Sequence, residues 1–155
     1  MGFSVSASTA ILLVAAFASV GMLYTSAANG FEQVSDATLT QQEQALETEN
    51  TDVSIVNITH NTSGTTDYVN VTVENAGAST LHVSKTDLLL NGTYTNGFES
   101  RTLSTADGTI EAGTNGTDLW QPGENLTLVV HENVSKPFRV KVVSDRGVAA
   151  TEVVS

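Results

Sequence analysis

The sequence predicts an N-terminal transmembrane α-helix followed by an all-β immunoglobulin-like β-sandwich. No charged side chain occurs from Met1 to Phe31, and Glu32 is the first charged residue. From Val53 onward, apolar and polar residues alternate in short runs separated by Gly, Asn and Asp turns, the pattern of strands in two packed sheets. The predicted domains are a transmembrane helix (1–31), a helical stalk or linker (32–50) and an extracytoplasmic β-sandwich (51–155).

The uncharged segment has the length of a membrane span. A spanning helix needs about 20 predominantly apolar residues, and residues 7–28 supply them. Tyr24 lies near the outer end, where an amphipathic ring suits the membrane interface. The residues expected to anchor the helix are its large apolar side chains: Ile11, Leu12, Leu13, Val14, Phe17, Val20, Met22 and Leu23.

Three other interpretations of this segment are disfavoured. Residues 26–28 (SAA) resemble a signal-peptidase cleavage site, but the segment lacks the positively charged start of a signal peptide. Residues 1–6 match the myristoylation pattern, which belongs to cytosolic proteins, whereas the rest of this chain has extracellular character. A buried helix of a soluble core is disfavoured because the segment is apolar all round.

The stalk is predicted to continue the helix. Residues 32–50 contain no Gly or Pro and are rich in Gln and Glu. The apolar side chains form a sparse stripe, and the acidic face is expected to be solvated. The stripe consists of Phe31, Val34, Leu39, Ala45 and Leu46.

The sandwich strands follow from period-two alternation. They are expected at residues 53–58, 68–73, 81–90 (one or two strands), 126–130, 138–143 and 148–154. Thr102, Leu103 and Ile110 are expected to be short pieces of a loop-rich stretch. The expected core residues are Trp120, Phe98, Phe138, Leu89, Val71, Leu128 and Val142.

The charge balance excludes several classes of partner. Lys and Arg total 6 against 17 Asp and Glu, giving a net charge of −11. Nucleic acids and anionic lipid surfaces are disfavoured, because both need a basic face. An acidic, Lys-poor surface is typical of halophilic proteins, since molar salt shortens the Debye length to about 3 Å and screens self-repulsion. The absence of cysteine excludes disulfides and thiolate metal sites.

Glycosylation sequons indicate an exported surface. Seven N-x-S/T sequons follow the helix, and none has Pro in the middle. This number favours an exported, glycosylated domain, with the N-terminus inside and the C-terminus outside the cell. The candidate N-glycosylation sites are Asn57, Asn61, Asn70, Asn91, Asn115, Asn125 and Asn133.

No catalytic constellation is present in the sequence. His60, His82 and His131 are too far apart along the chain for a local ligand pair, and G-x-S-x-G and phosphate-loop motifs are absent. We therefore expect no enzyme activity, no metal and no cofactor. Recognition is expected at exposed strand edges or at two Gly/Asn-rich loops, residues 91–97 and 112–119, unless glycans at Asn91 or Asn115 cover them.

Several motifs resemble a known family. The motifs are residues 1–10 (MGFSVSASTA), 29–34 (NGFEQV), 73–77 (VENAG), 88–92 (LLLNG) and 119–124 (LWQPGE). Together with the single helix they resemble the FlaF/ArlF proteins of haloarchaeal archaellum operons, over essentially the whole chain. The sandwich motifs are also similar to domains of the partner FlaG (ArlG) and of some archaeal pilins.

The resemblance implies a stator-associated role. FlaF-like proteins are single-pass proteins of the cytoplasmic membrane, and their sandwich lies outside, beneath the S-layer. The implied function is to anchor the archaellum motor by binding S-layer protein, with a FlaG-like protein as a further partner and a homodimer left open.

Other functions remain open on the sequence. The main alternative is a FlaG-like or pilin-like subunit of an extracellular filament, assembled through the N-terminal helix. True archaellins carry a charged leader before the helix, and the sequence as it stands shows none, which argues against the filament subunit. An extracytoplasmic solute- or sugar-binding accessory is a further alternative.

Overall fold

The computed structural model describes residues 3–63, 66–113 and 116–155, in two compact units, Met1–Gln44 and Ala45–Ser155. Helix α1 (Phe3–Glu49) runs without interruption for 47 residues, so the uncharged and the acidic segments share one helix. Its hydroxyl side chains bond to the helix's own carbonyls: Ser19 Oγ donates to Ala15 O at 2.8 Å and Thr25 Oγ1 to Gly21 O at 2.6 Å. This internal pairing lowers the cost of placing these hydroxyls in an apolar span.

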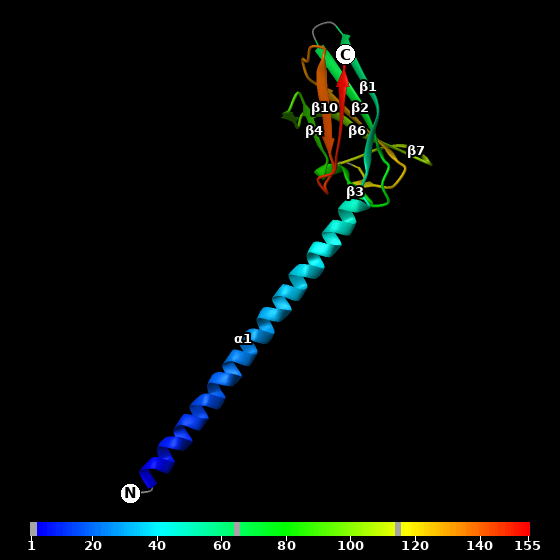
Figure 1. The fold of residues 1–155 in the computed structure, drawn as a ribbon. Coiled ribbons are helices and arrows are strands. Elements are labelled where there is room, and N and C mark those ends of the chain that lie inside the picture. Colours follow the sequence, from blue (N-terminus) through cyan, green and yellow to red (C-terminus); the bar gives the residue numbers. More distant parts are fainter. Residues whose placement is uncertain (1–2, 64–65, 114–115) are drawn as a thin grey trace. The chain divides into compact units, whose positions relative to one another are not determined.

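The second unit is a β-sandwich of antiparallel sheets (Figure 1). One sheet has the order β1-β2-β9-β6-β7, the other has the order β11-β10-β4-β5, and β3 and β8 form a small ribbon. The predicted class, a long apolar helix followed by an all-β sandwich, is confirmed. The strands are β1 (Val53–Ser63), β2 (Thr66–Asn75), β3 (Leu81–His82), β4 (Asp87–Leu90), β5 (Thr93–Thr95), β6 (Phe98–Thr105), β7 (Gly108–Glu111), β8 (Leu119–Trp120), β9 (Asn125–His131), β10 (Phe138–Val143) and β11 (Ala149–Val154), with a 3-10 turn, η1 (Val83–Lys85), between β3 and β4.

The core lies between the two large sheets. Alternate residues of each strand point inward, as period-two patterning requires. Trp120 of β8 is the largest fully buried side chain. The inward residues of the five-stranded sheet include Val69, Val71, Val73, Leu103, Leu126, Leu128 and Val130, and those of the four-stranded sheet include Leu88, Leu90, Phe138, Val140 and Val142.

Two expectations about the core need correction. Leu89 lies half-buried on the outer face of β4, because its neighbours Leu88 and Leu90 point inward and sides alternate along a strand. Phe98 is half-buried and packs against the buried core without being part of its fully buried centre. The other expected core residues are buried: Trp120, Phe138, Val71, Leu128 and Val142.

Strand β6 is the main departure from the sequence-based prediction. Residues 102 and 103, expected to be part of a loop-rich stretch, lie in an eight-residue strand that pairs with both β9 and β7. A register shift between Phe98 and Ser100 adds an extra residue and breaks the alternation of β6. The apolar pattern is therefore too weak to predict the strand.

A buried asparagine ties two distant turns together. Asn75, at the end of β2, is fully buried, and its side-chain nitrogen donates to Ser79 O at 2.9 Å and to Trp120 O at 3.1 Å. Trp120 Nε1 in turn donates to Glu124 O at 2.8 Å. The 73–77 and 119–124 motifs therefore meet in space, and both have a structural role.

The last turn of α1 belongs to the second unit. Residues 45–49 lie within the Ala45–Ser155 unit, where the Glu47 carboxylate pairs with Arg146. Thr51 Oγ1 donates to Glu47 O at 2.7 Å, and Ala78 N donates to Asn50 O at 2.8 Å. The compact β unit therefore begins inside α1, at Ala45, ahead of the first strand at Val53.

Candidate functional site

The two loops expected to carry recognition border the same groove. Residues 93–95 of the expected 91–97 loop form strand β5, and Asn96 follows this strand. Asn96 and Ala112, which begins the 112–119 loop, both line an open groove of about 270 Å³. Residues 114–115, which include the sequon Asn115, lie outside the described residues. The remaining lining residues come from β6 and β7: Phe98, Glu99, Ser100, Arg101 and Glu111.

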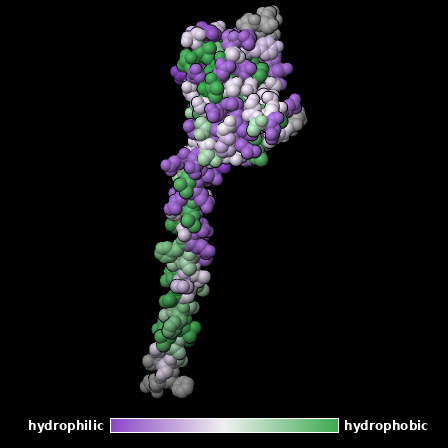
Figure 2. Space-filling model, turned by 90° about the vertical axis from the view of Figure 1, so that its right-hand side faces the viewer, coloured by the Kyte–Doolittle hydropathy of each residue, from purple (hydrophilic) through white to green (hydrophobic). Residues whose placement is uncertain are grey.

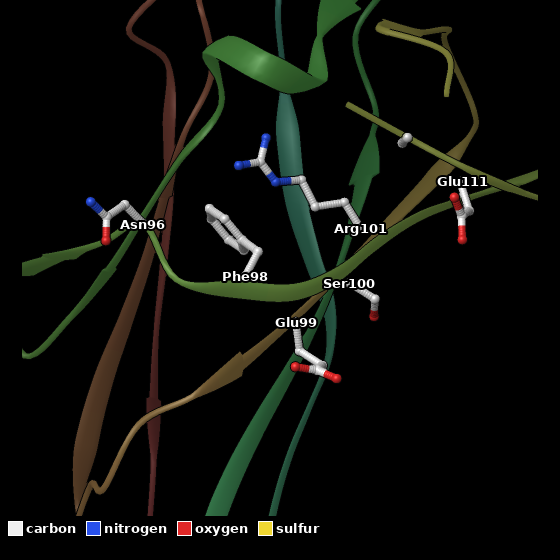
Figure 3. Close-up of a pocket in the computed structure, with 7 residues that line it drawn as sticks. Asn96, Phe98, Glu99, Ser100, Arg101 and Glu111 are labelled. Carbon is white, nitrogen blue, oxygen red and sulfur yellow. The ribbon is translucent and has the colours of Figure 1, made fainter. Parts of the chain in front are cut away.

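An arginine stacked on an aromatic ring lines this groove. Arg101 Cζ lies 4.1 Å from the centre of the Phe98 ring. Figure 3 shows these two side chains on one side of the β6 ribbon, whereas Glu99 and Glu111 point away from them. Within the described chain, no carboxylate forms an ion pair with Arg101.

This arrangement is suited to binding an anion. Stacking on Phe98 fixes the plane of the guanidinium and covers one of its faces. The edge of the guanidinium carries N–H donors spaced to match a carboxylate. The groove can therefore hold a carboxylate group of a partner against Arg101, with Asn96 at the rim as a further polar group.

Sequence reasoning missed the pairing of these two residues. In a regular strand, residues three apart point to opposite faces of the sheet. The extra residue between Phe98 and Ser100 returns residues 98 and 101 to the same face. The sequence offers no signal of this bulge, so it predicts Phe98 only as a core residue and gives Arg101 no role.

The histidines lie in three separate places, each beside one acid. His60 Nε2 lies 3.6 Å from Asp67 Oδ2, and His131 Nε2 lies 3.2 Å from Glu99 Oε2. The third histidine, His82, neighbours Asp118. Among the described residues, no three His, Cys, Asp or Glu side chains are grouped as metal ligands.

The carboxyl group of Asp118 has a lowered pKa. Its Oδ1 accepts a hydrogen bond from Ser84 N at 2.7 Å, and its Oδ2 lies 3.1 Å from His82 Nδ1. The backbone hydrogen bond from Ser84 is the main cause that lowers the pKa of Asp118 below its ordinary value of 3.8, and His82 adds to it. The carboxylate thus fixes the start of η1 and has a structural role.

The family model named archaeal-type flagellin matches residues 2–154, nearly the whole chain. The chain belongs to the archaeal-type flagellin family. It is therefore an archaellum-related protein, and its family consists of structural components of the archaellum.

Two solved structures share weaker similarity with this chain. The archaellum periplasmic stator protein complex FlaF and FlaG from Sulfolobus acidocaldarius matches at 12% identity and a TM-score of 0.42, covering 66% of this chain and 87% of the other. The Northeast Structural Genomics Consortium target SoR45 matches at 11% identity and a TM-score of 0.24, covering 69% and 83%. At these values neither similarity supports a functional argument. No curated protein matches the chain.

The side chains of the expected membrane anchor of this family member are exposed on α1. Within the described residues, the stretch from Ser6 to Glu49 contains the one apolar window long enough to cross a membrane, and none of that window is buried. Figure 2 shows apolar residues covering the N-terminal part of the helix, with polar residues becoming frequent toward its C-terminal part. The exposed anchor residues are Ile11, Leu12, Leu13, Val14, Phe17, Val20, Met22 and Leu23.

The described sequons fall into two groups. The Oδ1 atoms of Asn70 in β2 and Asn125 in β9 are buried, and both residues pair with neighbouring strands on either side. Asn91 has a positive φ of 53°, and its Oδ1 accepts a hydrogen bond from Arg139 N at 2.9 Å. The exposed sequon asparagines are Asn57, Asn61, Asn91 and Asn133.

Proposed function

We propose that this archaeal-type flagellin family member is a membrane-tethered, stator-associated protein that anchors the archaellum motor by binding S-layer protein. The observation that carries the proposal is the convergence of two loops on the Arg101–Phe98 groove. Loops on a rigid sandwich commonly carry recognition. The domain then acts as a binding module and performs no chemistry.

The proposed topology is single-pass in the cytoplasmic membrane. Helix α1 crosses the bilayer once, with the N-terminus inside and the sandwich outside, beneath the S-layer. An apolar exposed span and four exposed sequons on the sandwich support this orientation. A FlaG-like protein is the proposed partner within the archaellum.

The proposed contact is a carboxylate of the S-layer protein bound by Arg101. Arginine is enriched among residues that dominate binding energy, and the ring of Phe98 restrains its side chain before the partner arrives. A buried carboxylate–guanidinium pair at the centre of an interface also gives specificity, because a partner without the acid leaves the guanidinium unpaired.

The test uses the full chain in detergent micelles and S-layer protein extracted from archaeal envelopes at high salt. We expect the full chain to retain S-layer protein and Arg101→Ala to weaken retention by about 30-fold or more, as for a central arginine. Lys85→Ala is the matched control, because Lys85 is an exposed cation that does not line the groove. A deletion strain should keep its filaments but lose swimming.

Two results together would exclude the anchoring role: no retention of S-layer protein by the full chain, and normal swimming of the deletion strain. Equal loss of retention in Arg101→Ala and Lys85→Ala would keep the anchoring role but remove the groove as its site.

A filament subunit is the second candidate function, and the family match over residues 2–154 favours it. In that case the chain assembles through its N-terminal helix. Filaments sheared from cells and purified would contain the chain as a main component, and the deletion strain would lack filaments. Under the anchoring proposal, sheared filaments lack the chain.

A further inference from the structure

The outer face of the four-stranded sheet combines apolar and cationic side chains. Leu89 in β4 pairs with Tyr94 in β5 on one side and Lys141 in β10 on the other, and Lys141 pairs with Thr151 in β11. The next row carries Arg139 opposite Val153. We define the cationic face by these six residues: Leu89, Tyr94, Arg139, Lys141, Thr151 and Val153.

Exposed apolar groups and positive charges occur together on this face, which is unusual in such an acidic chain. The exposed fractions of Tyr94 and Val153 are 57% and 55%, and a shallow groove of about 480 Å³ runs beside Leu89, Arg139 and Lys141. The face holds two of the six Lys and Arg residues in a chain of net charge −11. No ion pair involving Arg139 or Lys141 forms among the described residues, and Asp87 is the acid at the far end of β4 on the same side.

Helix α1 carries a stripe of complementary character. Successive helical residues are about 100° apart, so Asp36, Leu39, Glu43 and Leu46 all lie within about 40° of Glu32 around the helix axis. These five residues are exposed, and the two leucines expose 55% and 58% of their surface. Residues 32–50 contain no Lys or Arg. We define Glu32, Asp36, Leu39, Glu43 and Leu46 as the acidic stripe.

We propose that the cationic face binds the acidic stripe of a second copy of this chain. The carboxylates of the stripe meet Arg139 and Lys141, while its leucines cover Leu89, Tyr94 and Val153. The stripe is long enough to cross the whole face: four strands are about 14 Å across, and the stripe from Glu32 to Leu46 is about 21 Å long. Both surfaces alternate apolar and charged groups, so charge fixes the register and apolar burial supplies affinity.

This contact leaves the groove free. Arg101 and Phe98 belong to the five-stranded sheet, whereas the cationic face is the outer side of the four-stranded sheet. Copies that associate through the cationic face therefore still present the groove to another partner. The inference goes beyond the proposed function and holds for an anchoring protein or a filament subunit.

The absence of cysteine gives a direct test by engineered disulfides. Leu89→Cys and Leu39→Cys are made in two separate full-length chains, which are purified in detergent, mixed and oxidised. We expect a disulfide-linked heterodimer in at least ten-fold excess over the product of the control pair Ser54→Cys with Leu39→Cys. Ser54 is an exposed residue of β1, in the other sheet.

Charge reversal tests the register of the contact. Arg139→Glu with Lys141→Glu, placed in the chain that carries Leu89→Cys, should abolish the disulfide-linked heterodimer. Adding Asp36→Lys with Glu43→Lys to the chain that carries Leu39→Cys should restore it. Circular dichroism of each variant checks that the fold is retained. The proposal fails if the control pair cross-links equally well, if no heterodimer forms between folded chains, or if charge reversal leaves the yield unchanged.

Discussion

Asn75 donates a hydrogen bond from its side-chain nitrogen to the main-chain oxygen of Trp120 at 3.1 Å, across 45 residues of sequence. The same residue also accepts from Gly77 N at 3.2 Å through Oδ1, and its main-chain oxygen accepts from Gly123 N at 2.8 Å. This single buried residue therefore provides hydrogen-bond partners for main-chain groups of both turns. The local geometry of these turns depends on this residue and not on the apolar core alone.

Replacing Asn75 with alanine should destabilise the domain. The change removes both donors and leaves the half-buried Ser79 carbonyl and the buried Trp120 carbonyl without this partner. Such unsatisfied groups cost about 1–3 kcal/mol each, so we expect a loss of about 3 kcal/mol in the free energy of unfolding. Urea unfolding followed by the fluorescence of Trp120, the single tryptophan, measures it.

The matched control is Asn61→Ala. Asn61 is an exposed residue of β1, so its removal should change the free energy of unfolding by less than about 0.5 kcal/mol. Equal losses in the two variants would mean that the buried hydrogen bonds of Asn75 add nothing to stability.

The stability contribution of Asp118 should depend on pH. Its pKa is lowered in the folded state, so the contribution is present above the ordinary value of 3.8 and is lost as pH falls through the folded value. Asp118→Asn should therefore be less stable than wild type near neutral pH, and the difference should close in strong acid. The effect is small, because the side chains of Asp118 and His82 are 41% and 36% exposed.

Unfolding of both proteins across the acid range measures this difference. An Asp118→Asn penalty that is constant over the whole range would show that shape and hydrogen bonding matter here, and that the charge does not.

Glycan occupancy should follow side-chain exposure. We expect glycans at exposed sequons such as Asn57, Asn61 and Asn133, and none at Asn70 or Asn125, whose Oδ1 atoms are buried within the sheet. Both side chains are half-buried, so an attached glycan would have to displace neighbouring packed groups. Mass spectrometry of glycopeptides from protein isolated from its native membrane reads each site, and a heavily occupied Asn70 would contradict the exposure rule.

The helix end should stabilise the isolated sandwich. A chain of residues 45–155 keeps Glu47 and its pair with Arg146, and Asn50, whose oxygen accepts from Ala78 N. A chain of residues 51–155 loses these partners. We expect both to be soluble and rich in β structure, with the longer one more stable by about 1–3 kcal/mol. Circular dichroism and urea unfolding compare them; a mostly helical spectrum or a more stable short chain would refute the argument.

The proposed topology predicts that external protease cleaves the sandwich and leaves the membrane span intact. Protease added to intact cells stripped of S-layer should digest the sandwich and spare residues 7–28, because the bilayer shields an apolar span. Antibodies against tags at each end identify the surviving fragment. Complete protection of the sandwich with an accessible N-terminus would reverse the orientation.

The sequence by itself determined the parts of this protein that depend on local pattern. The absence of charge up to Phe31 predicts a long apolar helix, and alternation predicts strands such as β2 and β10, where Val71 and Val142 are buried. These predictions succeed because the spacing of apolar residues along the sequence shows which side of a helix or strand is apolar. Asn75 and Gly123 are also recognisable from the sequence as turn residues.

Only the tertiary structure decided which distant residues meet. The pairing of Arg101 with Phe98 depends on one extra residue in β6, which changes the side to which every later side chain points. The hydrophobicity of Leu89 predicts a core residue, yet its place between two inward-pointing leucines puts it on the outer face of the sheet. Local pattern predicts the helix and the regular strands, but strand register, sheet pairing and the bulged strand β6 arise from contacts between residues far apart in the chain.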